Sequence, residues 1–374
     1  MRKPTIGIAV DSFLPRWDGV SRALIEFIPR LTPNFNFKLL VPGYPGERPS
    51  FDGTEYALFP LLPWLRLEGA GVAIARKAKM KTACHGIDLL WTHSVGTLGG
   101  KAMSEASARS LPIVSMIHSI EWEIYAENLP FLKSVFRNYW LKECRKRYRD
   151  ATRIITPSQA TADTLRAHGF SPPISVTPLG VDTVRFQPLN ATERAERKNA
   201  LGIDKRHFVI GYLGRFGAEK NLELLARAFD QLDAPSTHLL MVGGDSGALK
   251  YRPDASRVTF VGSTTEPERY FQAMDAYVLP SRSESAPLAI LEAMATGAIP
   301  LSTPVGNVPS YLHTDVGYLF EQDNLPSLIR QLKQLLSDPG KHPQMRQRAR
   351  DLVVSKFDWN ESAARLATIF SELL

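Results

Sequence analysis

Cysteine is scarce in this sequence, and long apolar runs are missing. The 374 residues include two cysteines, Cys84 and Cys144, with no second pair nearby. This pattern offers neither a disulfide framework nor a zinc site, and we expect both thiols to be packing residues. The longest apolar stretches have the length of a strand, whereas a membrane span requires roughly 18 residues. Because the apolar run after Met1 is also too short for a signal peptide, we expect a cytoplasmic protein.

Three short ligand-binding motifs are also missing. Neither a G-x-x-x-x-G-K-[ST] phosphate loop nor a G-x-G-x-x-G dinucleotide loop occurs, which disfavours an NTPase or an ordinary dehydrogenase. No D-x-D tripeptide supplies a two-carboxylate clamp for a metal ion. We therefore expect no metal and no cofactor, and positive charge for an anionic ligand must come from basic side chains and a helix dipole.

The net charge of +7 lies entirely in the first half. Residues 1–190 contain 24 Lys and Arg against 16 Asp and Glu, whereas residues 191–374 contain 21 against 22. This asymmetry indicates an anionic partner for the first half. Within it, Phe131 to Arg149 interleaves basic and aromatic residues, a composition typical of a helix at an anionic membrane surface. The alternative is a core helix with a solvated basic side. No recognised motif favours nucleic acid.

Short β-rich runs alternate with helix-like segments along the whole chain. Several runs are apolar without alternation, which a parallel sheet buried on both faces requires, so the sequence predicts an α/β, doubly wound class. The pattern restarts after a proline-containing stretch, and the length exceeds what one core usually supports. We expect domains at 1–182 and 183–356, with a final helix at 357–374. The predicted strands are Thr5 to Val10, Phe37 to Pro42, Ile87 to Thr92, Pro112 to Ile117, Arg153 to Thr156, His207 to Leu213, Leu239 to Val242, Val258 to Val261, Ala276 to Leu279 and Ile299 to Leu301.

The segment from Ser281 to Gly297 reads as a strand end, a turn and a helix. Ligands of doubly wound folds bind at such strand ends. Ser283 and Ser285 are candidate N-caps, and Pro287 suits the first helical turn. The backbone N–H groups of Ala286 to Leu288 would then face a diphosphate, with the helix dipole behind them.

Two carboxylates in this segment are candidate ligands for hydroxyl groups. Glu284 lies in the turn and Glu292 in the helix, and carboxylates accept strongly from hydroxyls. The alternative is that Glu284 is a capping acid and Glu292 a solvated helix residue.

A second loop, Gly211 to Leu222, brings Arg215 and Lys220 to another strand end. Cations at a helix start oppose the dipole, so a bound anion explains them better than a solvated pair does.

These segments resemble the family-4 retaining glycosyltransferases of the GT-B fold, over nearly the whole chain. An E-x-x-P-L-x-x-L-E-A-M-A-x-G string starts at Glu284, and a G-R-x4-K segment starts at Gly214. The resemblance implies two Rossmann-like domains that face each other across a cleft. The first would bind the acceptor and the second the nucleotide sugar, with the C-terminal helix returning to the first.

The resemblance also implies roles for single residues. Arg215 and Lys220 would stabilise the donor diphosphate, Glu284 would bind hydroxyls of the transferred sugar, and Glu292 would bind the ribose. The counterparts of Gly262 and Ser263 lie beside the nucleobase.

In the first half, the family has a glycine-rich turn after the opening strand. Here it reads Asp18-Gly19, where many members have two glycines. Gly19 would let backbone approach the diphosphate, although Asp18 adds a negative charge. The family's histidine is matched by His118, which would contact the sugar. His93 is a weaker candidate near the acceptor.

We therefore expect a metal-independent, retaining transfer of a hexose from UDP-hexose or GDP-hexose. A lipid or lipid-linked acceptor is favoured, with the protein peripheral on the inner face of the membrane. The alternatives are a soluble-sugar or polysaccharide glycosyltransferase, a sugar-nucleotide 2-epimerase of the same fold, and a scaffold with a decayed site.

Overall fold

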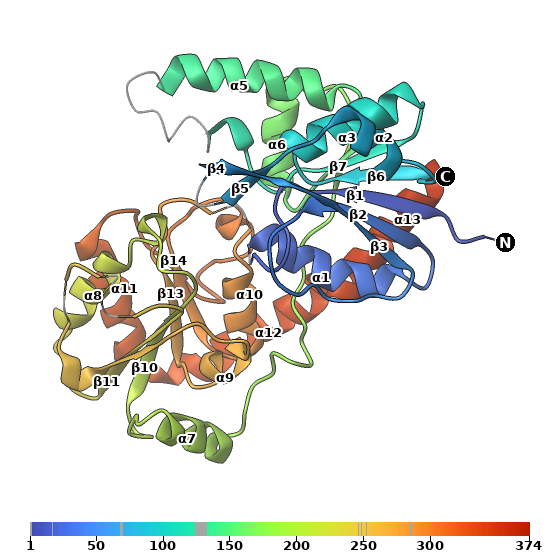
Figure 1. Ribbon diagram of the computed structural model, residues 1–374. Helices are drawn as coiled ribbons and strands as arrows, with labels where there is room; N and C mark the ends of the chain where they lie inside the picture. Colours follow the sequence, from blue (N-terminus) through green and yellow to red (C-terminus); the bar gives the residue numbers. More distant parts are fainter. Residues whose placement is uncertain are drawn as a thin grey trace. The chain divides into compact units, whose positions relative to one another are not determined.

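The computed structural model describes residues 2–16, 18–67, 70–123, 133–245, 247, 249–251, 253–284 and 286–374. The chain divides into two compact units. The first consists of Met1–Leu179 and Trp359–Leu374, and the second of Gly180–Asp358. Each unit is built on its own parallel sheet with helices around it (Figure 1).

The first sheet has seven strands among the described residues, in the order β3-β2-β1-β6-β7-β8-β9. Its central strands are buried on both faces, as the unbroken apolar runs require. Because β1 lies between β2 and β6, the strand order reverses direction at β1 and β6, and ligands of such sheets bind beyond that point. The strands are β1 (Thr5–Ala9), β2 (Asn36–Pro42), β3 (Thr54–Phe59), β6 (Leu89–Thr92), β7 (Ile113–Met116), β8 (Arg153–Thr156) and β9 (Ile174–Val176).

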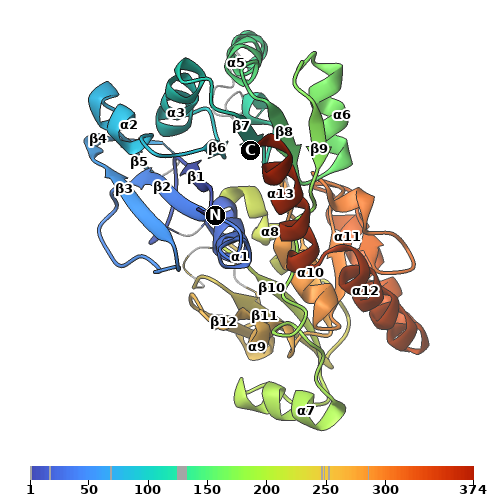
Figure 2. The ribbon, with the colours of Figure 1, turned by 90° about the vertical axis from the view of Figure 1, so that its right-hand side faces the viewer.

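The C-terminal helix α13 (Trp359–Leu373) packs within the first unit, alongside α1 (Gly19–Leu31) (Figures 1 and 2). The rings of Phe27 and Trp359 meet edge to face with centroids 5.0 Å apart. The unit also contains α2 (Lys77–Ala83), α3 (Thr97–Ala108), α5 (Lys133–Tyr148), α6 (Gln159–Ala167) and an antiparallel pair, β4 (Leu61–Leu67) and β5 (Ala70–Ala73).

The second sheet has six strands among the described residues, in the order β12-β11-β10-β13-β14-β15. Its order reverses between β10 and β13, so it has the same kind of crossover as the first. The strands are β10 (Phe208–Leu213), β11 (Thr237–Val242), β12 (Val258–Val261), β13 (Ala276–Leu279), β14 (Ile299–Ser302) and β15 (Tyr318–Leu319). The helices are α7 (Ala191–Ala200), α8 (Leu222–Asp230), α9 (Pro267–Phe271), α10 (Leu288–Ala295), α11 (Leu325–Ser337) and α12 (His342–Lys356), with short 3₁₀ turns η2 (Ala218–Lys220), η4 (Ala255–Arg257), η5 (Val308–Ser310) and η6 (Pro339–Lys341).

The α/β, doubly wound class predicted from the sequence is confirmed, and every predicted strand is present. The structure adds strands at the sheet edges, β3, β9 and β15, that the sequence pattern did not predict. These strands are less buried than the central ones, so their residues lack the unbroken apolar run that marks an inner strand. Within the described part of the chain, no helix is both long enough and apolar enough to cross a membrane.

Candidate functional site

Two loops of the second unit meet where its strand order reverses. One follows β10 and contains Arg215 and Lys220, and the other follows β13 and contains Glu284. The Nζ atom of Lys220 lies 2.6 Å from Oε1 of Glu284, although 64 residues separate them. The Ser281 hydroxyl donates to the same Oε1 at 2.7 Å. The structure therefore brings two of the candidate site residues, Lys220 and Glu284, into direct contact.

Burial makes this contact different from an ordinary surface ion pair. The Lys220 side chain is 18% exposed and that of Glu284 12%, so both charges are partly removed from solvent. A surface pair contributes about 0–1 kcal/mol, whereas partly buried charges interact more strongly. Arg215 differs, because it is 73% exposed and pairs with Glu219 of its own loop at 2.8 Å.

Two buried tyrosines hold the backbone of the first loop. The Tyr212 hydroxyl donates to the carbonyl of Arg215 at 2.9 Å, and the Tyr277 hydroxyl donates to that of Leu213 at 3.2 Å. Gly214, between these carbonyls, has φ +156°, and a Cβ there would lie 2.7 Å from the Tyr212 hydroxyl. Only glycine fits this position, which explains the glycine of the G-R-x4-K segment.

Arg282 joins the two loops. Its backbone N–H donates to the Glu219 carbonyl at 2.8 Å, and its guanidinium contacts the carboxylate of Asp323 at 2.8 Å. Asp323 also accepts from the side chain of Asn221 at 3.0 Å. Asn221 and Asp323 both have positive φ, at 52° and 54°, an uncommon backbone conformation that often marks a functional loop.

The helix after Glu284 begins later than predicted. Helix α10 starts at Leu288, and Pro287 is its N-cap residue, with extended backbone and no side-chain cap. The prediction of Ser283 as N-cap and of Pro287 inside the first turn was therefore wrong, and Ser285 lies outside the described residues. A proline disfavours the helical conformation in the residue before it, so the helix does not extend back through Ala286. Pro287 also has no N–H to offer a ligand.

Glu292 and the predicted nucleobase residues have contrasting environments. Glu292 lies in α10 and is 2% exposed, which rules out a solvated helix residue. Gly262 and Ser263 follow β12 and are exposed, and a Cβ at Gly262 would meet nothing within 4 Å. The N–H of Gly243, at the end of β11, donates to the carbonyl of Gly262 at 3.2 Å, so the ends of these strands lie together.

In the first unit, Asp18 and Gly19 form the start of α1. The Asp18 carboxylate accepts the backbone N–H of Ser21 at 2.8 Å, so it is the N-cap of the helix. Gly19 is the first helical residue, and a Cβ there would have nothing within 4 Å. The negative charge noted in the sequence thus has a local function, since Asp is a favoured N-cap.

The two candidate histidines of the first unit contact each other. His93 follows β6 and His118 follows the neighbouring strand β7, and Nδ1 of His93 lies 2.8 Å from Nε2 of His118. Burial lowers the pKa of His118 to about 4, while the Asp18 carboxylate acts in the opposite direction. Burial, together with His118, lowers the pKa of His93 well below its ordinary value. Both imidazoles are therefore neutral near pH 7.

Comparisons with known proteins identify the family. A model described as "Glycosyl transferases group 1" matches residues 193–352, and one described as "Glycosyltransferase Family 4" matches residues 17–185. Together they cover most of the chain. The chain belongs to the family-4 glycosyltransferases.

The chain is also similar to individual proteins of known name or structure. Sulfoquinovosyl transferase SQD2 of Arabidopsis thaliana is 25% identical over 75% of this chain and 55% of its own length. The chain spans about half the length of the curated relatives it matches. Sucrose-phosphate synthase of Thermosynechococcus elongatus has the same fold, with a TM-score of 0.78 at 19% identity over 100% of this chain and 99% of that one. Anabaena HepE in complex with UDP-glucose has a TM-score of 0.75 at 18% identity, over 98% and 99%. The predicted GT-B fold is thereby confirmed.

Two acidic residues near the histidines of this family-4 member were not predicted from the sequence. Asp11, which follows β1, accepts the backbone N–H of Leu98 at 2.8 Å and so caps the start of α3. Glu121 accepts the Tyr148 hydroxyl at 3.0 Å and lies 3.6 Å from the Cys144 thiol. Burial raises the pKa of Glu121 to about 7, against the hydrogen bonds from Tyr148 and Cys144. The position of Asp11 directly after the first strand is a pattern from which it could have been predicted. No sequence pattern indicates Glu121.

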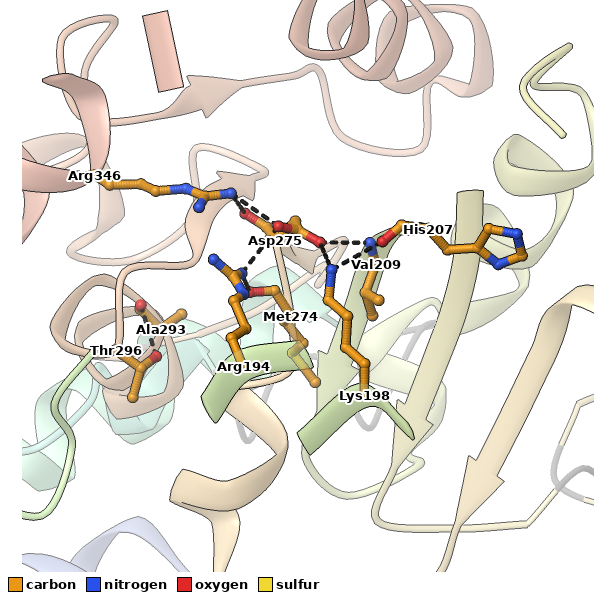
Figure 3. A network of polar contacts seen from close by, with 9 residues as sticks. All are labelled: Arg194, Lys198, His207, Val209, Met274, Asp275, Ala293, Thr296 and Arg346. Atoms are coloured by element: carbon orange, nitrogen blue, oxygen red, sulfur yellow. Dashed lines mark hydrogen bonds and ion pairs between the residues drawn. The ribbon is translucent and has the colours of Figure 1, made fainter. Parts of the chain in front are cut away.

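Asp275 forms a charged network with three cations of the second unit, but at the other end of β13 (Figure 3). Its carboxylate contacts Lys198 at 2.6 Å, Arg346 at 3.0 Å and Arg194 at 3.1 Å. It also accepts the backbone N–H of Val209 at 2.9 Å. Burial raises the pKa of Asp275, but the three cations outweigh burial and lower it. Because the network joins α7 and α12 to the start of the strand, away from the loops after β10 and β13, we assign it a structural role.

No group of three or more His, Cys, Asp or Glu side chains within the described ranges is arranged to hold a metal ion.

Proposed function

We propose that this chain transfers a hexose from UDP-hexose or GDP-hexose to an acceptor, without a metal ion and with retention of the anomeric configuration. The observation that carries the proposal is the partly buried contact between Lys220 and Glu284 at the carboxyl ends of β10 and β13. A cation and a carboxylate at the same edge of the sheet match the diphosphate and the sugar of a nucleotide sugar. Lys220 neutralises the diphosphate, and Glu284 accepts from hydroxyls of the sugar.

The neighbouring groups fit the remaining parts of the donor. The start of α10, at Leu288, has no side-chain cap and adds the positive end of a helix dipole for the diphosphate. Arg215 is exposed and supplies a second cation. Glu292 contacts the ribose, and the open surface at Gly262 accommodates the base. HepE, which has this fold, was solved with UDP-glucose, and this favours a uridine donor.

In the first unit, His118 contacts the transferred sugar, and Gly19 allows backbone N–H groups at the start of α1 to approach the diphosphate. The open space at Gly19 supports this role, since no atom of the described residues crowds the helix start there.

A lipid or lipid-linked acceptor is proposed from the surface of α5. Val135 and Tyr139 are 65% and 57% exposed, and the exposed Lys142 and Lys146 continue the same helix face at spacings of three and four residues, with the exposed Arg149 just after the helix end. The opposite face carries the buried Cys144 and Tyr148. An exposed face with aromatic and basic residues suits the peripheral surface of an anionic membrane. Phe131 and Leu132 lie outside the described residues.

Thermal unfolding with sugar nucleotides tests the donor assignment. A ligand that binds only the native protein raises its stability, by about 2.7 kcal/mol at 100 times its Kd. UDP-glucose or GDP-mannose is expected to raise the Tm of the wild type, and the shift is expected to vanish in Lys220→Ala. Lys205→Ala, an exposed lysine of the same unit, is the matched control and is expected to keep the shift. A wild type that none of the sugar nucleotides stabilises contradicts the proposal.

The sugar-nucleotide 2-epimerase alternative needs no acceptor. Incubation with UDP-glucose or UDP-N-acetylglucosamine alone, followed by analysis of the sugar, distinguishes the two. An epimerised nucleotide sugar without any acceptor supports the epimerase, whereas release of UDP supports transfer.

A further inference from the structure

His93 is buried beside His118 in a geometry that determines where the protons of both rings lie. The ring centroids are 5.1 Å apart, the ring planes differ by 19°, and the nitrogens in contact are 2.8 Å apart. The two nitrogens therefore lie between nearly coplanar rings. A ring N–H and a ring lone pair both point outward in the plane of the imidazole, so this is a well-aligned hydrogen bond.

The His93 ring is held firmly. Its centroid lies 4.5 Å from that of Trp91, and Trp91 is itself fully buried against Phe27 and Phe370. The backbone N–H of His93 donates to the Ala9 carbonyl at 3.1 Å, which continues the sheet. His93 is 4% exposed. A side chain fixed in this way presents its Nδ1 to His118 in one orientation.

The surroundings of His93 select its tautomer. Its second nitrogen, Nε2, is buried and has no partner among the described residues. A buried N–H without a partner is rare and costly. The proton of neutral His93 therefore lies on Nδ1, which donates to Nε2 of His118. A neutral imidazole carries one proton, so His118 carries its own on Nδ1.

We propose that His93 is a positioning residue that holds His118 in the tautomer with the proton on Nδ1, so that this nitrogen donates a hydrogen bond to a sugar hydroxyl. The hydroxyl contact rests on the proposed function, in which His118 meets the transferred sugar. With Nε2 engaged by His93, Nδ1–H is the one ring group that His118 offers to a ligand. His118 is then a donor of fixed direction that needs no reorganisation when the sugar binds.

Nuclear magnetic resonance of the wild type tests the tautomer directly. Long-range ¹H–¹⁵N spectra of the protein labelled at histidine distinguish protonated from unprotonated ring nitrogens, and His118→Gln assigns the signal. At pH 7 the His118 ring is expected to have a protonated Nδ1 and an unprotonated Nε2, without any substrate. A proton on Nε2 overturns the proposal. No variant at His93 is needed, so this result does not depend on whether such a variant folds.

Two variants test the functional consequence. His93→Asn keeps an N–H donor near the position of Nδ1, whereas His93→Leu removes it. UDP release from UDP-glucose is the readout, because it needs no known acceptor. His93→Leu is expected to lower kcat about 100-fold, as small misplacements of catalytic groups do, and His93→Asn to restore most of it.

Equal losses in the two variants, or wild-type rates in His93→Leu, contradict the positioning role. If the wild type is neither stabilised by UDP-glucose nor releases UDP from it, the proposed function and the hydroxyl contact fail together. The spectrum then decides the tautomer independently, so the two failures are distinguishable.

Discussion

Lys220 and Glu284 carry the proposed donor chemistry, and each has a test of its own. Glu284→Gln keeps the size and the hydrogen bond from Ser281 but removes the charge that faces Lys220. Lys220→Ala removes the cation. Each is expected to lower kcat about 10²- to 10³-fold, the usual cost of losing one preorganised electrostatic contact. The measurement is UDP release from UDP-glucose, with Tm to establish that each variant is folded.

Glu266→Gln is the matched control, because Glu266 forms an exposed pair with Arg269 at 2.9 Å in the same unit. Surface pairs of this kind contribute little, so its rate and Tm are expected to equal those of the wild type. A wild-type kcat in Glu284→Gln or in Lys220→Ala would contradict the assignment of this site.

Glu121 is a residue whose protonation links stability to pH. Burial raises its pKa from an ordinary 4.5 to about 7. Between these values the native state keeps a proton that the unfolded state has lost, so stability falls as pH rises through this window and is level above it. Glu121→Gln has no such proton. Its free energy of unfolding at pH 8 is expected to exceed that of the wild type by at most about 3 kcal/mol.

Urea unfolding at pH 4 and pH 8 measures this difference, which is expected to be small at pH 4. His93 and His118 have lowered pKa values, so they remove stability as pH falls below their ordinary 6.5. They are present in both proteins, and their effect cancels in the comparison. A constant difference at both pH values would mean that Glu121 is ionised throughout.

Helix α5 is the element on which the membrane proposal depends. Arg147 donates to the Val95 carbonyl, and Arg137 pairs with Glu123 at 2.6 Å, so part of the basic composition seen in the sequence holds the helix to its own unit. Lys142, Lys146 and Arg149 are exposed, and these are the residues proposed to meet a membrane. Each contributes about 1 kcal/mol at an anionic surface, and salt screens this attraction.

Vesicle flotation tests this element. The wild type is expected to float with phosphatidylserine-containing vesicles at low salt, and a Lys142→Ser, Lys146→Ser, Arg149→Ser variant much less. The matched control removes three exposed lysines of the second unit, Lys205, Lys333 and Lys356, and is expected to float like the wild type. If the wild type does not float with these vesicles, α5 is a solvated helix, and a soluble acceptor becomes the better proposal.

The elements also show how far a sequence predicts a site. The family resemblance assigned Lys220 and Glu284 to the same donor, and in the structure the two side chains contact each other at the carboxyl ends of β10 and β13. The start of α10 was misplaced, because the choice between Ser283 and Pro287 as N-cap depends on backbone that only the folded loop defines. The His93–His118 bond needs two side-chain orientations, of which Trp91 packing holds that of His93, and no sequence period encodes them.

At the scale of the whole molecule, the net charge is divided unequally between the two units. The first unit contains 24 Lys and Arg against 17 Asp and Glu, and the second contains 21 against 21. The net charge of +7 therefore belongs to the first unit, and the second unit is neutral. The diphosphate of the proposed donor would then be held by local charges, Lys220, Arg215 and the start of α10, and not by a general positive field. This is the physical basis for expecting transfer without a metal ion.

The corresponding prediction is that UDP release from UDP-glucose is unchanged by excess EDTA. Positive charge from fixed side chains and backbone does not depend on a chelatable ion. Loss of activity in EDTA that Mg²⁺ or Mn²⁺ restores would show that a metal neutralises the diphosphate. Lys220→Ala supplies the internal comparison. If added Mg²⁺ restores the rate of this variant but does not change that of the wild type, the lysine has the electrostatic role that a metal has elsewhere.

The anomeric coupling of the first-formed product, measured by ¹H nuclear magnetic resonance, is expected to match that of the donor. An inverted product would contradict retention.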